Sequence, residues 1–81
     1  MPLNELATSR RVVGERQVKR MLQAGRLGKL FVAADADPAL VEPLEAEAEK
    51  QNIPVEKVPD MVRLGRACAI TRGASAAGIS R

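Results

Sequence analysis

The apolar positions of this chain alternate between helical and strand-like spacing. Residues 11–13 predict a short strand that ends at Gly14. Apolar residues from position 15 onward then follow the i, i+3, i+4, i+7 spacing of one helix face, at Val18, Met21, Leu22 and Gly25. Gly25 can end that helix in the left-handed conformation. The continuous apolar run at 30–34 is typical of a strand that is buried on both faces.

The remaining segments extend the alternation over the whole chain. The pattern predicts a short helix over 3–7, a strand within 53–58, a helix over 61–68 and a last strand over 76–80. The resulting order, αβαβαβαβ, favours a three-layer α/β/α sandwich around a four-stranded mixed sheet. No repeat, linker or low-complexity tract interrupts residues 1–81, so we expect a single domain.

The middle of the chain begins with a helix-start signal and ends in an acidic segment. Asp37 is expected to be the N-cap and Pro38 the first helical residue. Pro43 then allows two interpretations, a kinked helix or a short turn over 38–42 followed by the main helix, and we favour the second. Leu44 and Ala48 would face inward. The acids of this segment would form a solvated surface, and they are Glu42, Glu45, Glu47 and Glu49.

Charge is strongly segregated along the chain. Residues 10–30 hold seven Lys or Arg and one acid, Glu15; residues 31–60 hold eight acids and two Lys; residues 61–81 hold four Arg and no acid. The two basic segments form one positive face if the middle folds between them, and the acidic helix would then lie on the far side. A positive face of this kind indicates a polyanionic partner, with RNA or DNA as the first candidates.

The composition excludes several classes of function. The chain has no His and one Cys, so Cys68 is expected in the core and unreactive, without a disulfide or cysteine-only zinc site. Asp35 and Asp37 provide too few ligands for a Mg²⁺ or Ca²⁺ site, and capping explains Asp37. We therefore expect no catalytic, metal or cofactor site. No signal segment or membrane-spanning run is visible, which favours a cytoplasmic protein without a membrane partner.

The helix after Gly14 carries the first candidate binding residues. Its exposed arc holds Arg16, Lys19, Arg20 and Gln23, with Gln17 at the flank. Helix N-termini accept phosphate, and Arg and Gln can read base edges in grooves. The alternative is an ordinary solvated helix face, although such faces usually mix both signs of charge.

A second basic cluster lies near the C-terminus, at Arg63, Arg66 and Arg72. Gly65 would permit either a close backbone approach or tight packing of a helix on the sheet. Residues 70–73 predict an exposed loop before the last strand. Ile70 in that loop could cover a base, or it could simply anchor the loop.

Four blocks of the sequence, taken together, resemble a known family: residues 12–25, 30–38, 52–59 and 64–79. The chain is similar to the kink-turn RNA-binding family of ribosomal proteins, the large-subunit ribosomal protein seven-Ae superfamily, and especially to its small stand-alone bacterial branch. The resemblance implies the α/β/α sandwich. It also implies binding to a kink-turn, a sharply bent RNA helix with tandem sheared G·A pairs.

The resemblance also implies roles for individual residues. Gly14 matches the family's Gly at the helix that enters the widened major groove, and Glu15 replaces a small or hydroxylated residue. Arg16, Gln17 and Arg20 stand where the family often has Asn, Glu and Lys, and they would read or clamp the G·A pairs.

The second half of the implied site lies in the C-terminal block. Gly65 and Arg66 match the family's Leu-Gly-Arg, and Lys19 and Arg66 would position phosphates. Ile70, Thr71 and Arg72 correspond to the loop over the flipped-out nucleotide. Thr71 and Arg72 are more polar than is usual there, so the resemblance implies a binder that relies more on charge.

The expected function is therefore a non-enzymatic RNA-binding protein that stabilises kink-turn RNA. The target would be a ribosomal, riboswitch or other noncoding RNA. The resemblance also allows the ribosome itself as a partner. The protein would act as a monomer. The alternative is a protein-interaction or assembly module that uses the acidic 42–49 face and has only generic electrostatic affinity for RNA.

Overall fold

The computed structural model describes residues 6–81 of the chain. From residue 11 onward the elements are β1 (Arg11–Val13), α1 (Glu15–Gln23), β2 (Leu27–Ala33), α2 (Pro38–Lys50), β3 (Val55–Val58), α3 (Met61–Ala67) and β4 (Ala76–Ser80). This confirms the alternating order from the first strand onward. The helix expected over 3–7 falls mainly on residues outside the described part.

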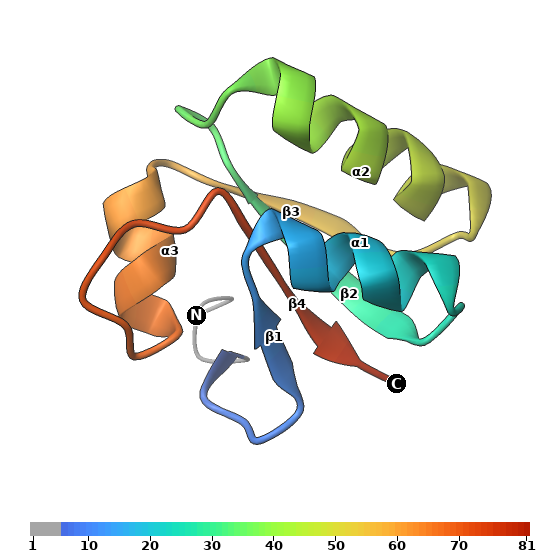
Figure 1. Ribbon diagram of the computed structural model, residues 1–81, viewed down its shortest axis with the longest axis horizontal. Coiled ribbons are helices and arrows are strands. Elements are labelled where there is room, and N and C mark those ends of the chain that lie inside the picture. Colours follow the sequence, from blue (N-terminus) through green and yellow to red (C-terminus); the bar gives the residue numbers. More distant parts are fainter. Residues whose placement is uncertain (1–5) are drawn as a thin grey trace.

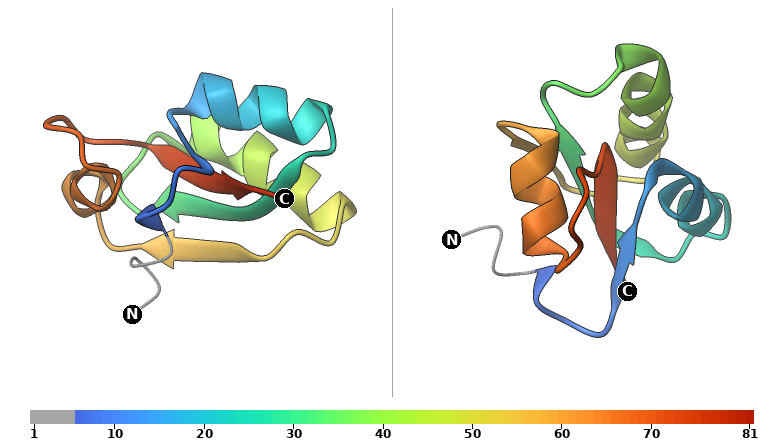
Figure 2. Two further views of the ribbon diagram at one scale, coloured as in Figure 1. Left: turned by 90° about the horizontal axis from the view of Figure 1, so that it is seen from below. Right: turned by 60° about the vertical axis from the view of Figure 1, so that its left-hand side comes forward.

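The four strands form a mixed sheet in the order β1-β4-β2-β3. β2 pairs in parallel with β3, whereas β4 runs antiparallel to both β1 and β2. α1 and α2 cover one face of this sheet and α3 covers the other (Figures 1 and 2). The expected three-layer α/β/α sandwich is confirmed. β2 lies at its centre, and Leu30, Phe31 and Val32 are fully buried there.

The expected position of the acidic helix on the far side is wrong, because α2 packs directly beside α1. The strand order explains this arrangement. β1 and β2 are both antiparallel to β4, so α1 joins parallel strands, and α2 does the same between β2 and β3. Both connections, from β1 to β2 and from β2 to β3, lead toward the edge of the sheet formed by β3. Because such crossovers are almost always right-handed, their helices must lie on the same face.

The expectation of a turn over 38–42 is also wrong, since α2 is one helix from Pro38 to Lys50 with Pro43 inside it. Asp37 is the N-cap, as predicted, and its Oδ1 accepts a hydrogen bond from Ala39 N at 2.9 Å. Val41 and Leu44, on either side of Pro43, are both buried. A continuous helix buries both side chains, and this packing outweighs the backbone hydrogen bond that proline cannot make.

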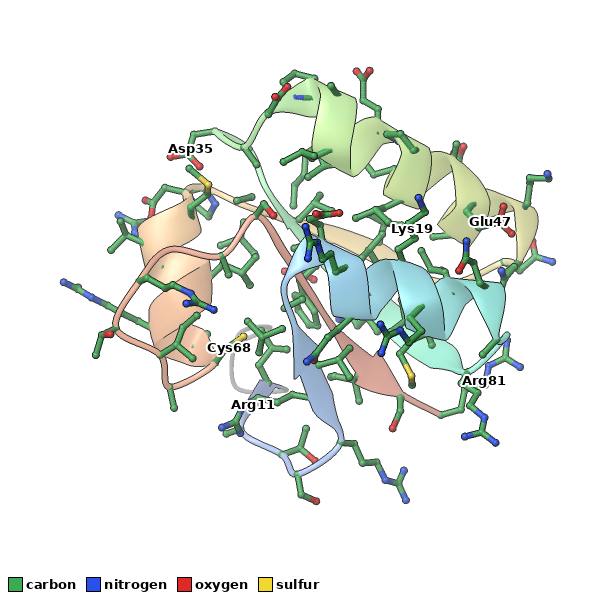
Figure 3. All side chains as sticks on the ribbon, viewed as in Figure 1. Arg11, Lys19, Asp35, Glu47, Cys68 and Arg81 are labelled. Atoms are coloured by element: carbon green, nitrogen blue, oxygen red, sulfur yellow. The ribbon has the colours of Figure 1, made fainter. Side chains whose placement is uncertain are left out.

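The other predicted ends and core positions are largely confirmed. Gly25 has φ +69°, the left-handed conformation expected after α1. Cys68 is buried, and desolvation raises the pKa of its thiol, while the nearby Arg11 guanidinium opposes that rise (Figure 3). Asp35 accepts a hydrogen bond from Met61 N at 2.8 Å, which ties the end of β2 to the start of α3. Its carboxylate therefore has a structural partner.

Candidate nucleic-acid interface

The start of α1 and the loop before β4 enclose a surface hollow of about 490 Å³. Its lining comes from two segments far apart in the sequence, residues 13–17 on one side and residues 70 and 72–75 on the other. Figure 1 shows the chain between α3 and β4 passing beside the end of β1 and the beginning of α1. The hollow thus joins the two regions that the sequence marks as candidate binding segments.

Backbone hydrogen bonds hold the two walls of the hollow together. Gly14 N donates to Ala76 O at 2.9 Å, where β1 ends beside the start of β4. Ala33 N donates to Ser75 O at 2.9 Å, and Ala74 N donates to Met61 O at 3.0 Å. The loop is therefore bonded to β2 and to α3, so its position relative to α1 is set by the sheet.

The first turn of α1 presents backbone donors at this hollow. Gly14 is the N-cap with φ +94°, a conformation that favours glycine, and it has no side chain to cap the helix. The first intrahelical bond is donated by Val18 N to Gly14 O at 3.1 Å, which leaves the N–H groups of residues 15–17 without a helical acceptor. Donors of this kind suit a phosphate or another anionic oxygen.

Gly65 explains how the loop can lie so close to α3. A Cβ at this buried position would run into the carbonyl oxygen of Arg72 and lie 3.3 Å from Gly73 Cα. Of the two roles considered for Gly65, the structure shows the close backbone approach, and the approaching segment is the loop. Ile70 N also donates to Gly65 O at 3.0 Å, which fixes the start of the loop on the end of α3.

The structure brings together some of the predicted site residues but not all of them. The walls of the hollow include six of them: Gly14, Glu15, Arg16, Gln17, Ile70 and Arg72. The others lie outside its walls: Lys19, Arg20, Gly65, Arg66 and Thr71. Arg20 is exposed one turn beyond Arg16 on α1, so it continues the same basic stripe, whereas Arg66 is exposed on α3.

Ile70 differs from its expected exposure. It is half-buried and packs against the hydrophobic core, while the neighbouring Thr71 and Arg72 are exposed. The anchoring role is therefore present in the structure, because part of the Ile70 side chain contributes to the core. The same residue also lines the hollow, so an apolar surface remains available beside the polar loop.

Lys19 lies on a different side of α1. It lines a groove of about 440 Å³ between α1 and α2, together with Glu15, Leu40 and Glu47. Figure 3 shows the Lys19 and Glu47 side chains in the region between these two helices. Lys19 therefore lies close to the acidic helix. Glu15 lines both this groove and the hollow, and it introduces a negative charge at the edge of the basic surface.

Sequence reasoning missed part of the lining of the hollow. Val13 and residues 73–75 contribute to it, and the sequence marked them only as a strand end and a turn. Nothing in their composition distinguishes them. Within residues 6–81, no three His, Cys, Asp or Glu side chains are grouped as metal ligands, and no helix is long and apolar enough to cross a membrane.

Relatives at the sequence level share a common description. The chain is 41% identical over 76 residues to an RNA-binding protein of Geobacillus sp. strain WCH70, with 94% of this chain and 93% of the relative covered. It is 43% identical over 70 residues to the RNA-binding protein YbxF of Geobacillus stearothermophilus, with 86% and 85% covered.

Solved structures and a family model agree with these relatives. The 15.5kD RNA binding protein of Giardia lamblia superposes with a TM-score of 0.89 at 25% identity, covering 98% of this chain and 70% of that one. The model of the ribosomal protein L7Ae/L30e/S12e/Gadd45 family matches residues 3–81. Because the match spans the described fold, including both walls of the hollow, the chain belongs to the ribosomal protein L7Ae/L30e/S12e/Gadd45 family.

Proposed function

We propose that this chain is a non-enzymatic RNA-binding protein that recognises kink-turn RNA and stabilises its bent form. One observation carries the proposal: the start of α1, with Arg16 and Gln17, lies against the loop of residues 70–75 around one hollow. The Geobacillus relatives are described as RNA-binding proteins, which supports the same class of partner.

The two walls suit different parts of a bent RNA. Arg16 and Gln17 are exposed donors at the first turn of α1. The backbone N–H groups of this turn have no helical acceptor, so they too can donate to a phosphate or carbonyl oxygen of the RNA. We assign these side chains, with Arg20 one turn further, to the sheared G·A pairs and the phosphates beside them. Arginine can bind guanine O6 and N7 with two hydrogen bonds, which suits this role.

The opposite wall combines a partly buried apolar side chain with exposed polar ones. Ile70 can contact an unstacked base, while Arg72 supplies charge beside it and Arg66 a cation on α3. Phe31 is the one aromatic residue of the chain and is fully buried, so stacking on an aromatic side chain plays no part. Binding would stabilise the bent RNA because only the bent form can contact both walls at once.

In this proposal the protein acts as a cytoplasmic monomer on a ribosomal, riboswitch or other noncoding RNA.

A gel-shift titration tests kink-turn recognition with two RNAs, a kink-turn and the same RNA with its G·A pairs replaced by Watson–Crick pairs. We expect much tighter binding to the first, with affinity falling as salt rises. Equal affinity for both RNAs would contradict kink-turn recognition and leave generic electrostatic binding.

The alternative, a protein-interaction module that uses the acidic residues 42–49, predicts a different result. Both RNAs should then bind with the same weak affinity, which falls as salt rises, or neither should bind. A charge-reversed variant of this face, Glu42→Lys with Glu49→Lys, serves as the matched comparison, since both side chains are exposed on α2. Under the proposed function this variant keeps its preference for the kink-turn RNA over the Watson–Crick control.

A further inference from the structure

Three exposed arginines gather at the end of the sheet opposite to the hollow. Arg10 precedes β1, Arg26 precedes β2, and Arg81 follows β4. Ser80 N donates to Arg10 O at 3.0 Å, and Arg81 N donates to Arg26 O at 2.8 Å. Since hydrogen-bonded strands lie about 4.8 Å apart, the three backbones lie within roughly 10 Å of one another. We call this set the arginine edge.

The arginine edge has no counter-charge within the part of the chain that the structure describes. The ion pairs found within residues 6–81 join Lys29 to Glu56, Lys57 to Glu45 and Arg63 to Asp60. Arg26 lies three residues after the last residue of α1, Gln23, near enough to the helix end for a cation to interact favourably with the helix dipole. That role does not apply to Arg81, which follows β4. Exposed cations without partners suit an external anion.

α1 connects the arginine edge to the hollow. Its nine residues span about 13 Å, and its first turn lines the hollow while its last turn leads into Arg26. Arg16 and Arg20, four residues apart, are exposed on the same face of the helix. Cations therefore continue from one end of α1 to the other. Figure 3 shows Arg81 on the side of the molecule where α1 ends.

We propose that the arginine edge binds the phosphate backbone of the RNA helix that continues from the kink, so that the interface extends beyond the hollow. This inference rests on the proposed function. The guanidinium groups of Arg26 and Arg81 can each bind a phosphate through two parallel hydrogen bonds. The arginine edge has no aromatic side chain on which an unpaired base could stack, so we assign its contacts to the phosphates of a duplex, which carry no base-sequence information.

The test compares wild-type protein with the double variant R26Q/R81Q on three kink-turn RNAs. One RNA has two short flanking helices, and in each of the others one of these helices is lengthened. Wild type should bind one lengthened RNA more tightly than the short one. R26Q/R81Q should lose that gain and bind the short RNA as before. On the lengthened RNA its slope of log affinity against log salt should be shallower by about 2, one for each phosphate contact removed.

Two control variants separate position from charge. R26K/R81K keeps both charges and should retain most of the gain, whereas K50Q/K57Q removes two exposed cations on α2 and β3 and should leave the gain unchanged. Glutamine at position 81 keeps the Cγ atom, which lies over Gly28 in the wild type, so this contact is retained. Thermal unfolding checks that every variant folds.

Several outcomes would overturn the inference while kink-turn recognition stands. These are no gain from either lengthened helix in the wild type, an unchanged gain in R26Q/R81Q, or an equal loss in K50Q/K57Q, which would show a nonspecific charge effect. Failure of the proposed function has a different signature. The wild type would then bind the short kink-turn RNA no better than its Watson–Crick counterpart, and the inference would fail with it.

Discussion

Glu15 and Arg16 occupy adjacent positions at the first turn of α1 but have opposite effects on an RNA partner. Glu15 favours the positive end of the helix dipole, and it is half-buried between the hollow and the α1–α2 groove. Arg16 is exposed at the hollow and supplies donors to phosphate or guanine. The acid therefore stabilises the helix start at some cost in attraction for phosphate, and the arginine compensates for that cost.

Arg20 provides the most direct residue-scale test of the binding face. We expect Arg20→Glu to weaken binding to kink-turn RNA by about 1–3 kcal/mol, because the side chain lies on the exposed basic stripe of α1. Its stability should change by less than about 1 kcal/mol, the value of a charge near a helix end. Isothermal titration and thermal unfolding measure the two effects.

Lys57→Glu is the matched control for this charge reversal, since Lys57 is exposed on β3 and its ion pair with Glu45 is long, at 4.0 Å. It should weaken RNA binding far less than Arg20→Glu. A large loss of stability in Arg20→Glu would instead show that Arg20 is structural.

Gly65→Ala tests how the loop wall is held. The added methyl group would meet the backbone of Arg72, which cannot move without breaking the hydrogen bonds of the loop. We expect a loss of about 1–3 kcal/mol in the free energy of unfolding, as for other overpacked sites, and a displaced loop with weaker RNA binding. Val62→Ala, an exposed change on the same helix, should leave both unchanged. Unaltered stability in Gly65→Ala would contradict the close approach.

At the scale of elements, α2 shows that tertiary packing can outweigh a local helix-breaking signal. Pro43 lies in the sixth position of the helix, where its ring takes the place of a backbone donor to Ala39 O. The helix continues because Val41, Leu44 and Ala48 are all buried. Gln51 adds a tie to α1, since its Nε2 donates to Leu22 O at 2.8 Å. α1 and α2 thus form one packed layer.

Pro43→Ala should therefore stabilise the protein. Alanine restores the missing helix hydrogen bond and removes the clash of the proline ring, which is worth about 3 kcal/mol. Loss of the rigid proline also frees the unfolded chain, which offsets about 0.4–1 kcal/mol of this, so we expect a net gain of about 1 kcal/mol or more. For a domain of this size that corresponds to a rise of roughly 4–8 °C in Tm. Pro38→Ala is the control, since proline is already favourable at the first helical position, and it should give no gain. A lower Tm in Pro43→Ala would contradict this account.

At the scale of the whole molecule, the fold determines how the segregated charges meet. The basic segment at 10–30 and the one at 61–81 come together at the hollow and again at the arginine edge, because β1 and β4 are neighbours in the sheet. The acidic α2 lies beside α1 on the same face, so positive and negative surfaces adjoin across one groove. The molecule is therefore polarised within a single helical layer.

Cys68 provides a test of the whole fold through pH. Burial raises the pKa of its thiol, more than Arg11 lowers it, so the folded state favours the protonated thiol. The free energy of unfolding should be constant below the usual thiol pKa, and it should fall as pH rises through that value, because the unfolded chain ionises first. The slope can approach 1.4 kcal/mol per pH unit.

Denaturant unfolding at a series of pH values measures this dependence, with Cys68→Ala as the comparison. The variant is expected to be less stable at neutral pH but to lose less stability as the pH rises. Parallel pH dependences in the two proteins would contradict the burial of the thiol as its cause.

Local pattern was sufficient to predict much of this molecule. The period of the apolar residues predicts α1 and its buried side chains, the continuous apolar run predicts β2 as a central strand, and Asp37 predicts the start of α2. These features depend on neighbours within one turn or one strand, so a short stretch of sequence is enough to predict them. The resemblance also identified the family correctly and marked both walls of the hollow.

Other features depend on contacts between residues far apart in the chain, and only the tertiary structure decided them. The strand order places α2 beside α1, the burial of Val41 and Leu44 carries a helix through Pro43, and the cross-strand hydrogen bonds assemble the arginine edge. Sequence alone determined the kinds of element and the partition of charge, because both are local properties. Which charged segments become neighbours was decided by the order of the strands, since that order follows from the packing of the whole sheet and its helices.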